Sequence, residues 1–204
     1  MTAIGPALRD LVTAVRADHA MLRHYDAKYG DPGRPASLGR DLITRVGFQM
    51  LTACRAMRFC ADAGIPLAPQ LTSRLIRHAY GSDVHWSANI EAGIVVVHGM
   101  GIAVSPEARI RRGAILFQHV TLGSGIDPES RATGAPTLER DVHIGAGSTL
   151  VGPITIGERS KITANCFVRA SVPADSLVVA PSPSVTVRRR PDGDGGRAHP
   201  ETDA

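Results

Sequence analysis

A histidine in a glycine-rich segment is the first candidate for acid–base chemistry. His98 lies in the run VHGMG at 97–101, where the glycines leave room for a ligand close to the backbone. Asp83 precedes His98 by fifteen residues. A carboxylate that holds one imidazole nitrogen leaves the other nitrogen free to act as a general base. We therefore expect His98 and Asp83 to form a catalytic pair, and a histidine with a purely structural role is the alternative.

The elements that would position this pair are repetitive. Aliphatic residues recur mostly at six-residue intervals, and small or aliphatic residues dominate four positions after them. The first set is Val84, Ile90, Val96, Ile102, Ile110, Leu116, Leu122, Leu138, Ile144, Leu150, Ile156, Ile162 and Val168. A period of six fits neither a helix nor an amphipathic strand, and it is typical of a three-sided solenoid in which each hexad forms one flat side. On this period Asp83 and His98 fall in neighbouring turns, and an ordinary β-sandwich with coincidental spacing is the alternative.

Two interruptions of the repeat predict irregular segments. The step from Ile102 to Ile110 contains two extra residues, which we place at the corner formed by Ser105 and Pro106. A larger insertion follows Leu122 and predicts a loop over 124–136. Loops expelled from a regular solenoid often carry binding groups, so this loop is a candidate for ligand contacts.

The N-terminal part of the chain follows a helical period instead. Apolar spacing predicts helices over 6–29, 38–63 and 70–79, separated by turn signals such as DPGRP at 31–35. We therefore divide the chain into a helical domain over 1–81 and a repeat domain over 82–187. The remainder, 188–204, is rich in glycine, aspartate and proline and predicts a disordered tail.

The composition excludes several function classes. The chain has 204 residues, of which 43% are apolar, and a formal net charge of +4, which is small for a nucleic-acid-binding protein of this size. We find no apolar run long enough to span a membrane and no export signal. Three cysteines cannot all pair with one another, which favours reduced thiols in the cytoplasm.

Four consecutive motifs resemble those of serine acetyltransferases. They are DVHWSANI at 83–90, HGMGI at 98–102, FQHVTLG at 117–123 and IGAG at 144–147. The resemblance extends over about residues 72 to 180. It implies an α+β fold in which the helical domain precedes a left-handed parallel β-helix of hexapeptide repeats.

The resemblance also implies a reaction and a co-substrate. An acetyl group would pass directly from acetyl-CoA to a hydroxyl, without an acyl-enzyme and without a metal. His98 would take the hydroxyl proton, and Asp83 would orient the imidazole. The residues implied to contact the coenzyme are Gly123, Gly145, Ala146, Thr163 and Ala164, with Lys161 near a coenzyme phosphate.

The acceptor side departs from the family pattern. Val97 stands where the family has an aspartate, and Gly134-Ala135-Pro136 stands where it has Arg-His-Pro. Each lost charge-assisted contact costs roughly 1.5–3 kcal/mol, so we expect weak binding of L-serine unless other groups compensate. Arg131 and His119 are the candidates for that compensation. The acceptor is therefore serine, a serine-like compound, or a different hydroxyl or amine.

A zinc enzyme and a non-catalytic scaffold are two alternative functions for the chain. Zinc at subunit interfaces, bound by three of the chain's histidines, would suit hydration of carbon dioxide, but His98, His119 and His143 lack the close spacing of a metal pair. A non-catalytic scaffold is the other reading. The resemblance implies a homotrimer or a hexamer. We do not expect a complex with a sulfhydrylase, because the family's C-terminal isoleucine is absent.

Overall fold

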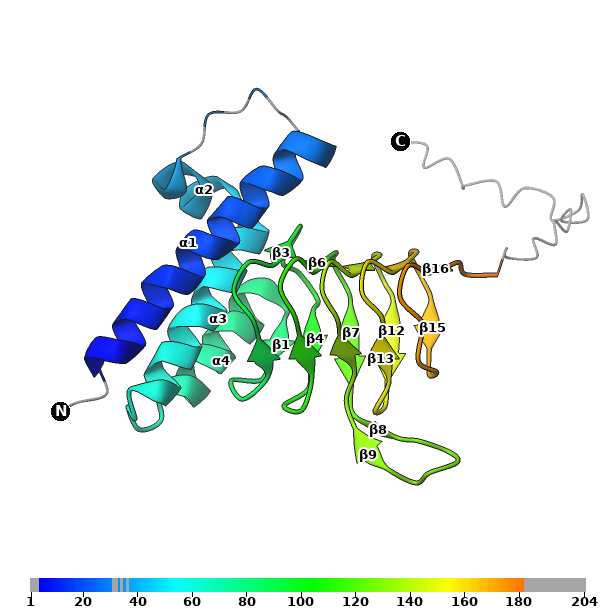
Figure 1. The fold of residues 1–204 in the computed structure, drawn as a ribbon. Helices are drawn as coiled ribbons and strands as arrows, with labels where there is room; N and C mark the ends of the chain where they lie inside the picture. Colours follow the sequence, from blue (N-terminus) through cyan, green and yellow to red (C-terminus); the bar gives the residue numbers. More distant parts are fainter. Residues whose placement is uncertain (1–3, 31–32, 34, 36, 182–204) are drawn as a thin grey trace, which may run out of the picture.

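The computed structural model describes residues 4–30, 33, 35 and 37–181. Figure 1 shows helices gathered at one end and a stack of short parallel strands extending away from them. The predicted tail over 188–204 lies outside the described residues. Among the helices that are described, none is both long and apolar enough to cross a bilayer.

The helical part contains one more break than the apolar spacing predicts. Its helices are α1 (Ile4–Tyr29), α2 (Leu38–Thr44), α3 (Val46–Asp62) and α4 (Ala68–Tyr80). The single helix predicted over 38–63 is wrong, because Arg45 adopts an extended conformation between α2 and α3. The Arg45 guanidinium donates a hydrogen bond to Asp26, a buried carboxylate of α1. The break between α2 and α3 is therefore accompanied by a tertiary ion pair. The spacing of apolar residues along 38–63 does not predict this break.

The strands form three parallel sheets and one short antiparallel hairpin. The first sheet contains β1 (Asp83–Val84), β4 (Ala103–Val104), β7 (Thr121–Gly123), β12 (Thr149–Val151) and β15 (Phe167–Val168). The second contains β2 (Asn89–Ile90), β5 (Arg109–Ile110), β10 (Thr137–Leu138) and β13 (Thr155–Ile156). The third contains β3 (Val95–Val96), β6 (Ile115–Leu116), β11 (His143–Ile144), β14 (Lys161–Ile162) and β16 (Leu177–Val178).

Apart from the hairpin strands β8 and β9, consecutive strands from β1 to β15 belong to the first, second and third sheets in turn. We call three such strands, one in each sheet, a rung. The aliphatic residues of the six-residue repeat are buried along these strands, apart from Ile90, which is half-buried, and Ile102, which is buried but precedes β4. The small residues four positions later, such as Ala114, Ser148 and Ser160, are buried as well. The expected stacking of aliphatic side chains between rungs is therefore confirmed.

The first interruption of the repeat lies at a different corner from the one predicted. Val84 pairs in register with Val104, and Val104 pairs with Leu122, so Val104 rather than Ile102 continues the stack in the first sheet. The interval from Val96 to Val104 is then eight residues instead of six. The two extra residues belong to the connection between β3 and β4, which contains His98, and the placement at Ser105 and Pro106 is wrong.

The second interruption forms a hairpin. Residues 124–136 include β8 (Gly125–Ile126) and β9 (Thr133–Gly134), which pair antiparallel. The Asp127 side chain closes the turn by accepting hydrogen bonds from the backbone of Glu129 and Ser130. These contacts stabilise the charged carboxylate and lower the pKa of Asp127. Figure 1 shows the hairpin projecting from the stack.

A buried ion pair attaches the helices to the first rung. Asp18 of α1 accepts two hydrogen bonds from Arg55 of α3, at 2.8 and 3.1 Å. Arg55 also donates to the carbonyl oxygens of Ile90 and Glu91. Asp18 accepts from the backbone of Gly93 as well, so one charged pair joins two helices to the corner after β2.

Candidate active site

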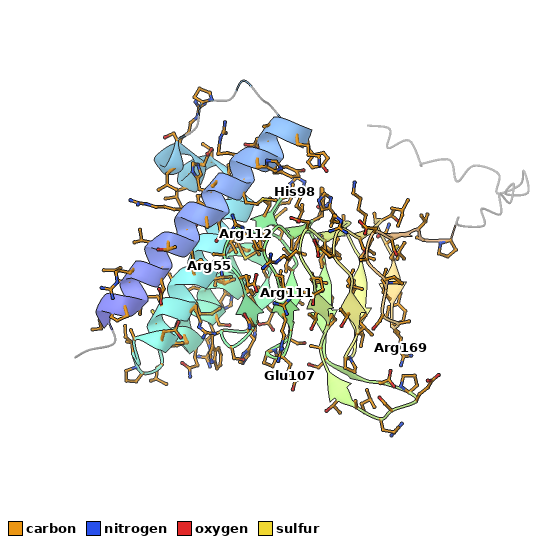
Figure 2. All side chains as sticks on the ribbon, viewed as in Figure 1. Arg55, His98, Glu107, Arg111, Arg112 and Arg169 are labelled. Atoms are coloured by element: carbon orange, nitrogen blue, oxygen red, sulfur yellow. The ribbon has the colours of Figure 1, made fainter. Side chains whose placement is uncertain are left out.

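His98 lies in the eight-residue corner that follows β3. The residue is exposed, and the glycines at 99 and 101 both adopt left-handed backbone conformations with φ of +67°. Its side chain borders a cavity of about 380 Å³ between the helices and the first rung. This cavity is lined by Tyr25, Asp26, Tyr29, Gly30, Thr44, Arg45, Val46, Val97, His98 and Met100. Figure 2 shows His98 near the C-terminal end of α1.

The start of α3 fixes the backbone beside His98. A Cβ atom on Gly47 would lie 1.9 Å from the Val96 carbonyl oxygen, and one on Gly99 would lie 2.8 Å from the Gly47 Cα. These two glycines allow the helix and the corner to touch backbone to backbone. The conformation of the His98 segment therefore depends on the position of α3.

Asp83 begins β1, the first strand of the first rung, and His98 follows β3, the last strand of that rung. The Asp83 carboxylate binds Arg77 rather than His98. The Asp83 Oδ1 atom accepts a hydrogen bond of 2.7 Å from the Nη2 atom of Arg77, and both side chains are more than half exposed. Asp83 lines a separate cavity of about 210 Å³ with His85 and Gly123. No hydrogen bond joins Asp83 to His98 in this structure of a single chain, so their pairing stays a prediction.

The backbones of the two segments nevertheless meet. The Ser82 hydroxyl donates to the Gly99 carbonyl oxygen at 3.2 Å and accepts from the Ile102 amide at 3.0 Å. Ser82 directly precedes Asp83, and Gly99 directly follows His98. The fold therefore brings the two chain segments together without joining their side chains.

The corner between the third and the first sheet continues from His98 along the stack. Residues with positive φ repeat on successive rungs at Gly101, His119, Gly147 and Asn165. The backbone amides of the last three bond to carbonyl oxygens of the preceding rung, with distances of 2.8 to 3.0 Å. This ladder makes the corner a continuous column of main chain.

Most of the predicted coenzyme residues lie on this column. Gly145 and Ala146 follow β11, and Thr163 and Ala164 follow β14. A Cβ on Gly145 would lie 2.6 Å from the Ala164 amide nitrogen, so the rungs are in close contact there. The other two predicted coenzyme residues lie elsewhere: Gly123 ends β7 in the first sheet, and Lys161 is exposed on β14.

Two acceptor-site candidates, Val97 and His119, lie at the His98 corner. A Cβ on Gly101 would lie 2.1 Å from the His119 Nδ1 atom, so the imidazole covers the backbone of Gly101. Val97 is half-buried and lines the cavity that His98 borders. His98 itself has a tilted ring contact with Phe117, at 6.5 Å between centroids.

The hairpin candidates are not near His98 in this chain. Arg131 is exposed in the turn between β8 and β9, and Ala135 is buried where the hairpin returns to the stack. The hairpin projects from one side of the stack in Figure 1, whereas His98 lies at the opposite side in Figure 2.

Several cavity residues have no signal in the sequence. Tyr25 and Asp26 reach the His98 cavity from α1, Arg45 reaches it from the break between α2 and α3, and Arg77 reaches Asp83 from the end of α4. Their positions depend on how the helical part packs against the first rung, which a local pattern does not reveal. A signal exists only for Arg77, because a basic residue is common in the last turn of a helix.

Metal ligands do not gather anywhere in the part of the chain that the structure describes. No group of three or more histidine, cysteine, aspartate or glutamate side chains is placed there to hold an ion.

His143 lies on the third sheet with its ring against Tyr29, at 5.9 Å between centroids. Burial lowers the pKa of His143, and the nearby ammonium groups of Lys161 and Lys28 lower it further.

Comparison with known proteins gives a consistent set of relatives, although no protein-family model matches the chain. The chain is 36% identical over 138 residues to a serine acetyltransferase of Synechococcus elongatus, covering 68% of this chain and 56% of the relative. It is 30% identical over 186 residues to the serine acetyltransferase of Mycobacterium tuberculosis, covering 91% of this chain and 77% of the relative. The chain spans about half the length of three cyanobacterial relatives.

Solved structures of the same name share the fold. The structure of serine acetyltransferase isoform 3 from Entamoeba histolytica in complex with cysteine has a TM-score of 0.75 and 25% identity, over 93% of this chain and 65% of that chain. A serine acetyltransferase in complex with CoA has a TM-score of 0.71 and 27% identity, over 83% of this chain and 66% of that chain.

Proposed function

The chain belongs to the serine acetyltransferase family, and we propose that it transfers the acetyl group of acetyl-CoA to the hydroxyl of serine or a serine-like acceptor. The observation that carries this proposal is the position of His98. Its imidazole stands in an enlarged, glycine-lined corner, at the start of a column of closely packed main chain. The pantetheine arm of acetyl-CoA can lie along such a column, with the thioester at its end beside His98.

The proposed chemistry needs one proton carrier. The unprotonated imidazole of His98 takes the proton of the acceptor hydroxyl as that oxygen attacks the thioester carbonyl carbon. The tetrahedral intermediate then collapses, the carbon–sulfur bond breaks, and the imidazolium returns the proton to the departing thiolate. Asp83 orients the imidazole and stabilises its charged form. For this contact the Asp83 carboxylate must turn from Arg77 toward His98.

We place the coenzyme along the corner column of a left-handed parallel β-helix. Gly145, Ala146, Thr163 and Ala164 have small side chains or none, which lets pantetheine approach the backbone. A solved relative in complex with CoA supports the choice of co-substrate. The chain is then a helical domain over 1–81 followed by an acetyltransferase domain over 82–187.

The acceptor pocket is the part in which this chain differs from its family. Val97 presents an apolar, half-buried side chain in the cavity that His98 borders. We propose that His119 supplies a polar contact in its place, because its ring covers the backbone of Gly101. Arg131 and Ala135 contribute only if a neighbouring subunit brings its hairpin to this corner. A different hydroxyl or amine acceptor is the second candidate, and Val97 is the observation that favours it.

The proposed active form is a homotrimer or a hexamer in the cytoplasm. Exposed apolar side chains on α1 and α4 offer surfaces for association of subunits. The cysteines at 54, 60 and 166 are free thiols, which supports the proposed location in the cytoplasm. We propose no metal, no nucleic acid, no membrane partner and no sulfhydrylase partner.

The test is a screen of hydroxyl and amine acceptors with acetyl-CoA, following released thiol. We expect turnover with serine or a serine-like acceptor, and about 10²- to 10⁴-fold less turnover for His98→Ala. Binding of coenzyme A should be unchanged in that variant, and Asp83→Asn should also lose activity. His78→Ala is the matched control, because His78 is exposed on α4. Full activity of His98→Ala would remove the proposed base, and failure to bind coenzyme A would favour a scaffold.

A further inference from the structure

The C-terminal half of α1 and the third sheet enclose a cavity of about 410 Å³. It is lined by Met21, His24, Tyr25, Lys28, Tyr29, Gly113, Ile115, Asp141, His143, Arg159 and Lys161. A neighbouring cavity of about 520 Å³ shares Met21, His24, Gly113 and Asp141 with it and adds Arg112 and Arg140. The two cavities therefore form one groove along α1, and Figure 2 shows Arg112 beneath that helix.

The groove gathers cations that have no carboxylate partner. Lys28, Lys161, Arg112 and Arg140 make no side-chain hydrogen bond or ion pair with an acidic group in the described part of the chain. Arg159 differs, because Glu158 and Asp175 both bind its guanidinium. Asp141 is the acidic residue that lines the groove. Four unpaired cations against one carboxylate give the groove a net positive charge.

Lysine is otherwise absent from this chain. Its 23 basic residues include only two lysines, Lys28 and Lys161, and both line the smaller cavity from opposite walls. Lys28 comes from α1 and Lys161 from β14. His143 lines the same cavity, and its imidazole contacts the Tyr29 ring. Ammonium groups and an imidazole are donors that suit a phosphate group.

We propose that Lys28, Lys161 and His143 bind a phosphate or diphosphate group in this groove. The volume of the cavity is in the range of small-molecule sites. The groove runs beside the corner over 112–113 and 140–141, which connects the second sheet to the third. The column proposed for pantetheine runs along the other edge of the third sheet. The phosphate site does not depend on the proposed acetyl transfer.

Two sources of the phosphate share this chemistry. The His98 cavity and the lysine cavity both include Tyr25 and Tyr29, so they lie on two sides of the same aromatic pair. A ligand that extends from one to the other would place its phosphates at the lysines, as the nucleotide end of acetyl-CoA does in the first case. A free phosphorylated metabolite is the second case.

The binding test uses sodium pyrophosphate and the full chain without substrates, at constant ionic strength, with calorimetry. We expect saturable binding that weakens at least about tenfold in the double variant Lys28→Gln/Lys161→Gln, because each lost ionic contact is worth about a factor of ten. The matched control, Arg9→Gln/Arg74→Gln, removes the same charge from exposed positions outside the groove and should bind like the native protein. Circular dichroism checks that all variants are folded.

The imidazole of His143 gives a local readout by NMR. Bound pyrophosphate adds negative charge beside the ring, so we expect the pKa of His143 to rise on binding. That change should be absent in the lysine double variant. No saturable binding by the native protein, or equal binding by the double variant, would overturn the proposal whatever the acetyl-transfer assay shows.

Kinetics then distinguishes the two sources. If the coenzyme supplies the phosphates, the double variant raises KM for acetyl-CoA and leaves KM for acetyl-pantetheine unchanged, since the latter has no nucleotide. If a free metabolite supplies them, saturating coenzyme A leaves the affinity for pyrophosphate unchanged. Either pattern supports a phosphate site at the two lysines.

Discussion

At the scale of single residues, the corner that holds His98 is built on conformations that most side chains avoid. His119 occupies a left-handed conformation with φ of +57°, and its ring fills the space above Gly101. Histidine is one of the residues that adopt this region more readily than most. The imidazole beside the proposed acceptor is therefore held by the backbone as well as by its packing.

A methyl group on Gly101 tests this arrangement. Gly101→Ala adds an atom at the position of the His119 ring and forces a left-handed alanine, so we expect a loss of about 1–3 kcal/mol in the free energy of unfolding. Acetyl transfer should fall as the ring is displaced. Gly81→Ala is the control, because Gly81 has φ of +60° and no atom within 4 Å of an added Cβ. Equal stability and activity of the two variants would show that His119 does not pack on Gly101.

The depressed pKa of His143 predicts a pH dependence of stability. In the folded protein the neutral ring is favoured, whereas in the unfolded chain the ring has its ordinary pKa of 6.5. The stability that His143 contributes is therefore complete above that value and is lost as the pH falls through the folded pKa. We expect urea unfolding at about pH 7.5 and about pH 5.5 to show a larger drop for the native protein than for His143→Gln. The same drop in both proteins would contradict the lowered pKa.

At the scale of the elements, the sequence predicts what repeats and misses what depends on tertiary contacts. The rung residues were predictable, because a period of six is visible over most of 84–168. The extra residues at the first interruption were misplaced, because Ile102 and Val104 are both aliphatic and both buried. Spacing alone does not decide which of the two continues the stack. The break at Arg45 depends on Asp26, which is nineteen residues earlier.

The residues of the candidate site also fall into two groups, those that the sequence predicts and those that depend on tertiary packing. The sequence predicts His98 as a base, and the family resemblance implies the small residues after β11 and β14 as coenzyme contacts; the fold places them all on one corner. The sequence does not predict Tyr25 or Arg45 at the cavity, since Tyr25 belongs to α1 and Arg45 to the break between α2 and α3, and neither segment carries the six-residue repeat. The partner of Asp83 was missed for that reason too, because Arg77 belongs to α4.

The contact between α3 and the His98 corner predicts an effect of Gly47→Ala. The added Cβ would collide with the Val96 carbonyl oxygen, so the helix must move away from the corner. We expect a loss of at least about 1–3 kcal/mol in unfolding free energy, together with reduced acetyl transfer. Gly39→Ala is the matched control in α2, where an added Cβ meets nothing within 4 Å. It should raise stability by up to about 1 kcal/mol, because alanine is the better helix former. A tolerated Gly47→Ala would argue against the close contact.

The ion pair of Asp18 and Arg55 predicts a second effect at this scale. Asp18→Asn leaves the buried guanidinium without its charge partner, and breaking such a pair costs about 3–5 kcal/mol. Asp62→Asn is the control, since the pair of Arg58 and Asp62 is exposed and worth at most about 1 kcal/mol. Chemical unfolding of both variants measures the difference. Similar losses in the two variants would mean that the buried pair does not hold the helices to the first rung.

At the scale of the whole molecule, a single chain leaves apolar surface uncovered on its helical end. Leu67, Leu71 and Leu75 recur every fourth residue at the start and along one side of α4, and all three are more than half exposed. Isolated apolar residues on a surface need no explanation, whereas three leucines along one side of a helix are a candidate contact for another subunit. The proposed trimer or hexamer supplies a partner for it.

The leucine stripe therefore predicts a change in assembly without a change in fold. Burying one leucine side chain stabilises by about 1.5–3 kcal/mol, so Leu71→Gln/Leu75→Gln should weaken an interface formed by α4 and shift the sedimentation coefficient to a smaller species. Because both side chains are solvent-exposed in the isolated chain, the far-UV circular dichroism should stay the same. Ile43→Gln is the control, since Ile43 is exposed on α2 outside the stripe. Unchanged sedimentation of the double variant would place any subunit contacts on the stack of parallel strands alone, and the helical end would then serve to hold the His98 corner rather than to join subunits.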